Sequence, residues 1–236
     1  MEVQLTKWNK SCAKTSPQVF LAGFQGLGVK RVVSSPLFSS PVEGRANYSL
    51  QAHLGYGNWM LDFPAWNDAP RRLRQLENGC GPLAAWGVLR YFHRRTSAAR
   101  LISACRYTVE NSTFVIALAV ALREHGLNVT FYSRHDPAPN KVERHCYTLA
   151  EQIGVRMGGE ARLEAILEQI TEGAVPLILY NTDDDNGHIS PLVGYSGGKV
   201  YLAHAASAKS QVMSRKELRR RWMAPEICRQ CLIVAK

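Results

Sequence analysis

The segment ENGCGPLAAWGVLRYFHRR (residues 77–95) places a cysteine between two glycines, followed by a proline and an apolar run. Proline is favoured in the first turn of a helix, and Leu83, Trp86 and Leu89 recur at helical spacing. The pattern predicts a helix over residues 82–94, with Cys80 at or just before its first turn. Free backbone N–H groups and the positive end of the helix dipole favour a thiolate there, so Cys80 is the candidate nucleophile.

The composition is that of a globular protein. The chain has 236 residues, of which 46% are hydrophobic and 20% are charged, which suffices for one domain with a substantial core. Residues 1–65 are rich in Ser, Pro, Gly and aromatic residues, which predicts an N-terminal extension or β-rich arm of unknown role. Helical and strand patterns follow, so residues 66–236 are predicted to form the main domain.

The formal net charge is +10, which suits an acidic partner or an anionic surface. Part of the excess lies in two basic clusters, at residues 71–74 and 215–221. The second cluster has Leu218 and Trp222 at helical spacing, so a solvated helix surface is the preferred interpretation. A nucleic-acid partner is not favoured, because aromatic residues are not interleaved with the basic ones as single-strand binding requires.

No segment approaches the ~20 apolar residues that a membrane-spanning helix needs, so no integral membrane segment is predicted. The first residues lack the charged and then apolar order of a Sec signal peptide. We therefore expect a cytoplasmic protein, or one exported without a Sec signal, as a secreted effector would be.

The six cysteines stand at irregular positions, which does not suggest a disulfide framework in a chain of this length. Cys228 and Cys231 resemble half of a zinc site, but no second pair lies at ligand spacing. A strand over residues 230–235 that enters the core is the preferred interpretation. We predict neither a metal nor another cofactor.

The order of the predicted elements indicates an α+β fold. Further helical patterns cover residues 97–106, 112–125, 142–153, 160–171 and 214–222. In the helix at 112–125, Ser112 or Thr113 is expected to cap the start and Gly126 to follow the end. Strand patterns cover residues 128–133, 175–180, 188–195, 199–204 and 230–235. Helices therefore dominate the first part and antiparallel strands the last.

Cysteine hydrolases and acyltransferases need a thiolate, a histidine that holds and returns its proton, and a third polar group that orients the imidazole. Nucleophile and base are usually far apart in the sequence. His188 is the best placed of the seven histidines, because it begins a strand beside Gly187 after a flexible acidic turn. We predict that Cys80 and His188 form the reactive pair; a structural role for His188 is the alternative.

Two motifs resemble those of papain-like cysteine peptidases of the bacteriocin-leader-processing (double-glycine) type. In QLENGCGPLAAW (residues 75–86), a glutamine shortly precedes a Cys-Gly pair that opens the central helix. GHISPLVGYSGGKVYLAH (residues 187–204) has a histidine on a strand, a hairpin and the third triad position. Its Gly-His-x-Ser-Pro start is also similar to phytochelatin synthase, a papain-fold transpeptidase. The resemblance implies a papain-like fold over residues 70–235, with a helical half carrying the nucleophile and an antiparallel β half carrying the histidine.

The resemblance implies a role for each matching residue. Cys80 is the nucleophile and His188 the general base and acid, and Gln75 stabilises the oxyanion together with the Cys80 backbone N–H. At the third position the family has an aspartate, whereas this chain has His204. A neutral imidazole can orient His188 but cannot stabilise an imidazolium as a carboxylate does. A Cys-His-His arrangement and a lost orienter, with Ser207 as a weak substitute, both stay open.

The function implied is a cysteine peptidase that cleaves a peptide or protein substrate through a thioester acyl-enzyme. The chain shows no ATP-binding or transporter part, so an effector, a toxin or a processing enzyme suits it better than leader removal during export. Thiol acyltransferases, transpeptidases and glutamine deamidases use the same fold and nucleophile and form one alternative. A non-catalytic, peptidase-like binding module is the other, favoured by histidine at position 204.

Overall fold

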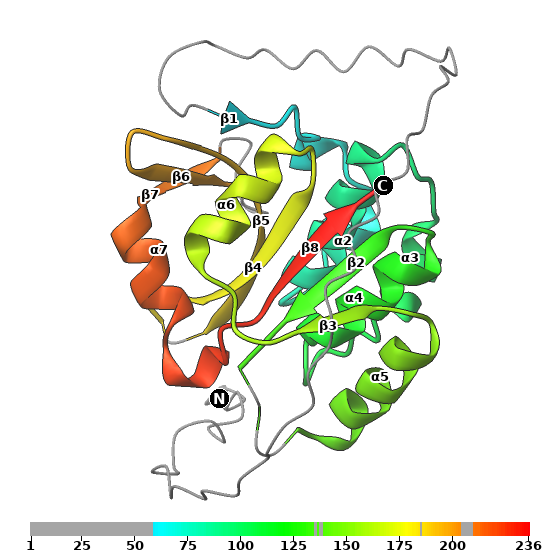
Figure 1. Cartoon of the computed structure of the whole chain (residues 1–236). Helices are drawn as coiled ribbons and strands as arrows, with labels where there is room; N and C mark the ends of the chain where they lie inside the picture. Colours follow the sequence, from blue (N-terminus) through cyan, green and yellow to red (C-terminus); the bar gives the residue numbers. More distant parts are fainter. Residues whose placement is uncertain (1–58, 135, 137–138, 185, 204–209) are drawn as a thin grey trace, which may run out of the picture. The chain divides into compact units, whose positions relative to one another are not determined.

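An eight-stranded sheet lies at the centre of the structure, a computed structural model that describes residues 59–134, 136, 139–184, 186–203 and 210–236. Its strands are β1 (Trp59–Met60), β2 (Asn128–Tyr132), β3 (Arg156–Gly158), β4 (Val175–Asn181), β5 (Gly187–Ser196), β6 (Lys199–Leu202), β7 (Gln211–Ser214) and β8 (Cys231–Ala235). The order is β3-β2-β8-β4-β5-β6-β7, and β1 pairs with the C-terminal half of β5 (Figure 1). All pairs are antiparallel except β2 with β3.

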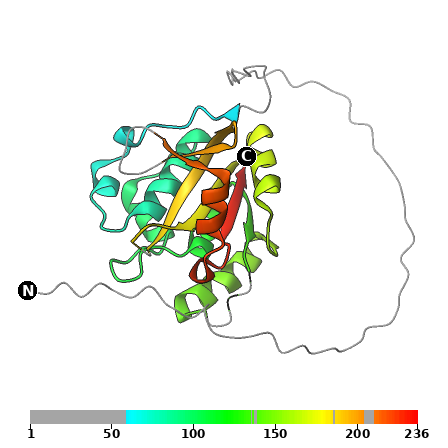
Figure 2. The same ribbon diagram turned by 90° about the vertical axis from the view of Figure 1, so that its left-hand side faces the viewer.

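Helices cover both faces of this sheet. α2 (Cys80–Tyr91) and α4 (Val115–Glu124) lie on one face, and α6 (Leu163–Thr171) packs against β4 and β5 from the other (Figure 2). α3 (Ala98–Ala104) packs on α2 and α4, α5 (Lys141–Gln152) packs on α4, and α7 (Arg215–Trp222) contacts β4, β6 and β7. The short turns α1 (Arg71–Arg74), η2 (Trp66–Asp68) and η3 (Pro225–Ile227) complete the helical elements of the described residues.

Two of the helices are buried on nearly all sides. Every residue from Gly81 to Leu89 of α2 is buried, and so is every residue from Val115 to Leu122 of α4. A helix that is apolar around its whole circumference belongs in the interior of a protein. The N-terminus of α2, where Cys80 lies, is therefore positioned by the packing of the core.

The predicted α+β class is confirmed, with a cysteine at a helix N-terminus and a histidine on the antiparallel part of the sheet. The predicted helix at 82–94 already begins at Cys80 and ends at Tyr91. Strand β8 confirms that Cys231 enters the core as part of a strand. It inserts between β2 and β4, however, so the sheet combines strands from both halves of the chain.

The expected cap at Ser112 or Thr113 is wrong. Helix α4 begins at Val115, its N-cap is Phe114, and no side chain caps it. Ser112 has a left-handed backbone (φ 54°), and its hydroxyl donates instead to the carbonyl oxygen of Asn78 at 2.8 Å. A side chain committed to a distant loop is not available to the first turn of its own helix.

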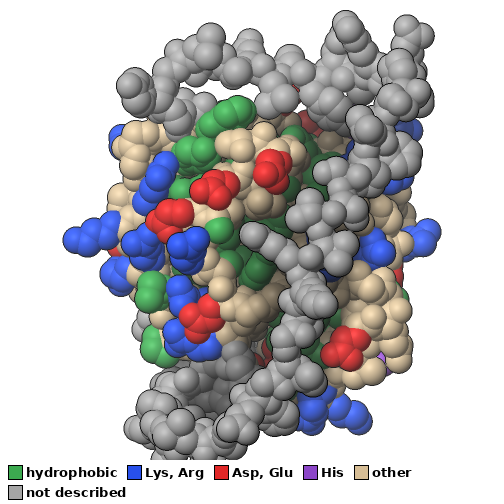
Figure 3. Space-filling view, in the orientation of Figure 1, with side chains coloured by type: hydrophobic (Ala, Val, Ile, Leu, Met, Phe, Trp, Pro, Cys, Tyr) green, Lys and Arg blue, Asp and Glu red, His purple; other side chains and the backbone are tan. Residues whose placement is uncertain are grey.

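The basic helix α7 has the solvated surface expected from its sequence. Leu218 and Trp222 are buried against the sheet, and basic side chains gather on the exposed side with acidic ones among them (Figure 3). Within the part of the chain that the structure describes, no helix is both long enough and apolar enough to cross a membrane.

The described chain begins with a strand that depends on a glycine. Trp59 and Met60 pair with Tyr195 and Gly194, and the Leu61 N–H donates to the Val193 carbonyl at 2.7 Å. A Cβ atom at Gly194 would lie 2.4 Å from the Trp59 carbonyl oxygen. Only a residue without a side chain lets β1 approach β5 this closely.

The substitution Gly194→Ala should therefore lower the free energy of unfolding by about 1–3 kcal/mol, the range of overpacked sites. Urea denaturation of the whole chain measures this change. Gly159→Ala is the matched control, because a Cβ there would have no neighbour within 4 Å, and it should stay within about 0.5 kcal/mol of the wild type. Equal stabilities of the two variants would contradict the β1–β5 pairing.

Candidate active site

Cys80 is the first residue of α2 and is partly exposed, although its thiol is enclosed by backbone groups. Its Sγ lies 4.0 Å from the carbonyl oxygen of Asn78, in the turn before the helix. The backbone N–H groups of Cys80, Gly81 and Ile189 also act on the sulfur. Because Ile189 follows His188 directly, the thiol lies beside the histidine-bearing end of β5.

A loop from another part of the chain holds the turn that carries Cys80. The Tyr107 hydroxyl donates to the Glu77 carbonyl, and the Ser112 hydroxyl donates to that of Asn78 at 2.8 Å. A Cβ at Gly81 would lie 2.8 Å from the Cβ of Thr113. The loop 107–113 therefore holds in place both the turn at residues 77–79 and the first residues of α2.

Burial is the dominant influence on the thiol, and it raises the pKa of Cys80 above its ordinary value. The N–H groups of Ile189, Gly81 and Cys80, followed by the Ser112 hydroxyl, favour the thiolate and act in the opposite direction. The sequence led us to expect a thiolate favoured by the helix N-terminus. Those donors are present, but desolvation outweighs them, so the net effect of the surroundings favours the neutral thiol.

His188 lies on the same face of the sheet as a buried tyrosine. It is the cross-strand partner of Tyr180 on β4, and the two rings meet edge to face with centroids 5.5 Å apart. Burial raises the pKa of Tyr180, and a charge on Cys80 would raise it further, so Tyr180 and Cys80 are within electrostatic reach of each other. Tyr180 thus contacts His188 and lies within electrostatic reach of Cys80.

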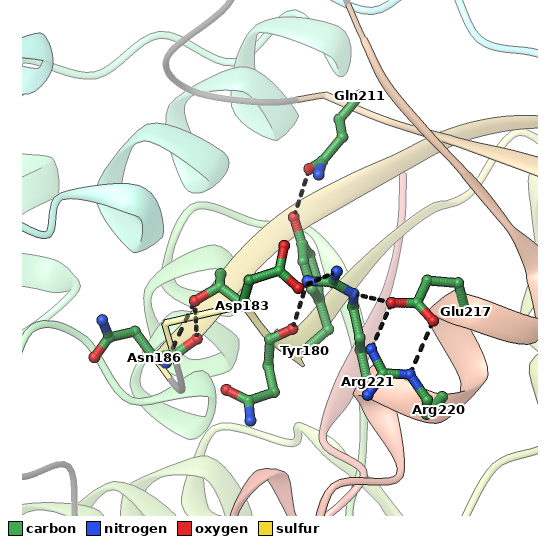
Figure 4. A network of polar contacts seen from close by, with 9 residues as sticks. Tyr180, Asp183, Asn186, Gln211, Glu217, Arg220 and Arg221 are labelled. Carbon is green, nitrogen blue, oxygen red and sulfur yellow. Dashed lines mark hydrogen bonds and ion pairs between the residues drawn. The ribbon is translucent and has the colours of Figure 1, made fainter.

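A polar network continues from this site toward α7 (Figure 4). The Tyr180 hydroxyl donates to Gln211 Oε1 at 3.0 Å. Beyond it, Arg221 pairs with Asp183 and Glu217, and Arg220 and Arg221 hold the pKa of Glu217 at about 2. Arg221 therefore engages Asp183 at the start of the turn that precedes His188.

Of the remaining predicted site residues, Gln75 is among the described residues. Gln75 is exposed and follows α1, and its backbone N–H donates to the Arg71 carbonyl. His204 and Ser207 lie outside the described residues. The last described residue before them, Ala203, donates its N–H to the Pro191 carbonyl on β5 at 2.9 Å. No group of three or more His, Cys, Asp or Glu side chains in the described residues is arranged to hold a metal ion.

Sequence reasoning missed Ser112, Tyr107 and Tyr180. Ser112 and Tyr107 are thirty or more positions away from the residues they contact, and only the fold brings them together. Tyr180 offered one signal, since it ends a predicted strand shortly before the candidate histidine.

Removing the Ser112 hydroxyl should loosen the turn that carries the thiol. Ser112→Ala keeps the same backbone strain and removes both the hydrogen bond to Asn78, worth about 1 kcal/mol, and a donor that favours the Cys80 thiolate. We expect the rate of Cys80 alkylation to change severalfold and the free energy of unfolding to fall by about that amount. Ser103→Ala, at an exposed position on α3, is the control. Identical alkylation rates in both variants would contradict the role of Ser112.

The raised pKa of Cys80 predicts a distinctive pH profile. Alkylation by iodoacetamide requires the thiolate, so its rate should keep rising with pH beyond the range of an ordinary cysteine, about 8.5. The rate constant, measured from pH 5 to 10 on the folded protein, reports this midpoint. A plateau reached below pH 7 would indicate a thiolate already formed at rest, contrary to the burial effect.

Solved structures that resemble this chain include peptidases with low sequence identity. A double-glycine-motif protease from an AMS/PCAT transporter, in complex with the leader peptide, has 15% identity over 66% of this chain and 83% of its own, with a TM-score of 0.41. The peptidase domain of Streptococcus ComA, a bi-functional ABC transporter, has 11% identity over 66% and 90%, with a TM-score of 0.46. A C39-like peptidase from Bacillus anthracis has 14% identity over 74% and 98%, with a TM-score of 0.49.

The first of these structures is a double-glycine-motif protease, the type of peptidase that the sequence motifs resemble. No protein-family model and no curated protein sequence matches the chain.

Proposed function

We propose that the protein is a cysteine peptidase in which Cys80 attacks a peptide carbonyl and His188 transfers the protons. The observation that carries this proposal is the position of the thiol, at the N-terminus of α2 and beside the backbone N–H of Ile189, next to His188. A nucleophile and a base from distant parts of the chain that meet at a helix terminus can perform acyl transfer.

The proposed reaction has two steps. In the first, the thiol proton moves to His188, the sulfur bonds to the carbonyl carbon, and the amide C–N bond breaks as His188 protonates the leaving amine. In the second, His188 takes a proton from water, the new hydroxide attacks the thioester, and the C–S bond breaks to give a carboxylic acid and the restored thiol. A neutral resting thiol requires the imidazole to act as a general base in the first step.

Two further residues have a place in the proposal. Gln75 is the proposed side-chain donor to the oxyanion, supported by its position in the turn that leads to Cys80. His204 is the proposed orienter of His188, supported by the hydrogen bond that joins Ala203 to β5. The peptide nature of the substrate and an exported effector or toxin role are expectations from the sequence.

A peptide-based electrophilic probe for cysteine proteases tests the reactive pair. We expect wild-type protein to be labelled, Cys80→Ala to lose the label, and His188→Ala to react about 10²–10⁴ times more slowly. Peptide mass spectrometry locates the label, and the free thiols of Cys105, Cys146 and Cys231 are buried, so they should not react.

His145→Ala is the matched control, because it removes an exposed histidine on α5 and should leave labelling unchanged. Equal labelling of the wild type and His188→Ala would refute the proposed base. If labelling behaves as expected, new N-termini in treated peptides identify hydrolysis, whereas acyl-transfer products or deamidated glutamines identify the alternative reactions.

A further inference from the structure

A pocket of about 410 Å³ lies at the other end of the helix that carries Cys80. Its lining includes Arg90, Arg94, Arg95, Trp86 and Asp68. Arg90 is ten residues beyond Cys80 on α2, which corresponds to ~15 Å along the helix axis. The pocket is therefore separate from the candidate active site.

The chain reverses direction at the end of α2 and brings the three arginines together. His93 has a left-handed backbone (φ 56°), and the Arg94 N–H donates back to the Leu89 carbonyl at 2.7 Å. This hydrogen bond spans the last turn, as in a Schellman motif, and folds the following residues against the helix. Arg94 and Arg95 thereby face the same pocket as Arg90.

The guanidinium groups of these arginines are not neutralised by the described parts of the chain. Ion pairs of the described residues engage Arg106, Arg134, Arg219, Arg220, Arg221 and Arg229, but none engages Arg90, Arg94 or Arg95. Among the described residues that line the pocket, Asp68 is the only carboxylate, so together these residues carry a formal charge of +2. The negative end of the α2 dipole, about half a charge, does not cancel this excess.

The other side of the pocket is apolar. Trp86 and Leu89 are almost completely buried, and Pro70 lies beside them in the lining. Trp86 also packs on Trp66 of η2, with ring centroids 6.4 Å apart, so α2 and the η2 segment form one wall. Arginine forks match planar oxyanions, and a cavity of this size holds a small molecule.

We propose that this pocket binds a small molecule bearing a multiply charged oxyanion group, either a phosphate cluster or a carboxylate cluster. The oxyanions bind Arg90, Arg94 and Arg95, and any apolar part of the ligand contacts the side formed by Trp86, Leu89 and Pro70. The site is independent of the proposed peptidase activity.

Titration calorimetry with pyrophosphate and citrate at constant ionic strength tests the pocket. At least one of them should bind saturably with one site per chain, and comparing the two identifies phosphate or carboxylate as the preferred group. In Arg94→Gln/Arg95→Gln the affinity should fall on the order of a hundredfold, because two charged hydrogen-bonding groups are lost.

Arg219→Gln/Arg220→Gln removes the same charge from α7 and is the matched control; it should keep the wild-type affinity within about threefold. Both pairs of side chains are exposed, and thermal unfolding verifies that the variants fold. Absence of saturable binding by both anions, or equal weakening in the two double variants, would overturn the proposal. Failure of Cys80 labelling would contradict the proposed peptidase activity but not the proposed anion site.

Discussion

The position of the Cys80 thiol depends on the close packing around the first turn of α2. A side chain at Gly81 would collide with Thr113, and the helix is buried from Gly81 to Leu89. Since core packing fixes the helix, it also fixes where the thiol of Cys80 meets β5. The hydrogen bonds from Tyr107 and Ser112 hold the turn before the helix in place. Three separate segments, α2, β5 and the loop 107–113, therefore determine the position of one sulfur atom.

The same packing decides the chemistry of the thiol. Burial disfavours a charged sulfur, while the N–H groups of Cys80, Gly81 and Ile189 favour it, and burial is the larger effect. Burial therefore opposes the thiolate, and the backbone N–H groups offset only part of that opposition. An ion pair of thiolate and imidazolium at rest would need the opposite balance. In the peptidase that we propose, this balance suits a base that removes the thiol proton during the reaction.

The sequence predicted what depends on neighbouring residues and missed what depends on distant ones. The Cys-Gly-Pro start of α2, the strand at His188 and the buried helix near residue 118 have strong local signals, and each lies close to its predicted place. β3 and β7 are short and largely exposed, so their patterns are weak. The insertion of β8 between β2 and β4 depends on pairing partners about a hundred and about fifty positions away, which no local pattern encodes. Ser112 is the clearest example. A serine before a helical pattern predicts an N-cap, but the Ser112 hydroxyl donates to the Asn78 carbonyl in the turn before Cys80.

The net charge of +10 shows why the number of basic residues says less than their partners. The most conspicuous basic cluster in the sequence, on α7, forms ion pairs with Glu164, Glu217 and Asp183. Much of its charge is therefore balanced locally. Arg90, Arg94 and Arg95 look less conspicuous because a helix end separates them along the chain. The reversal at His93 places them on one pocket without an ion-pair partner among the described residues. An unbalanced charge held beside an apolar wall attracts a specific anion more effectively than a larger number of balanced charges, because less of its field is cancelled by neighbours.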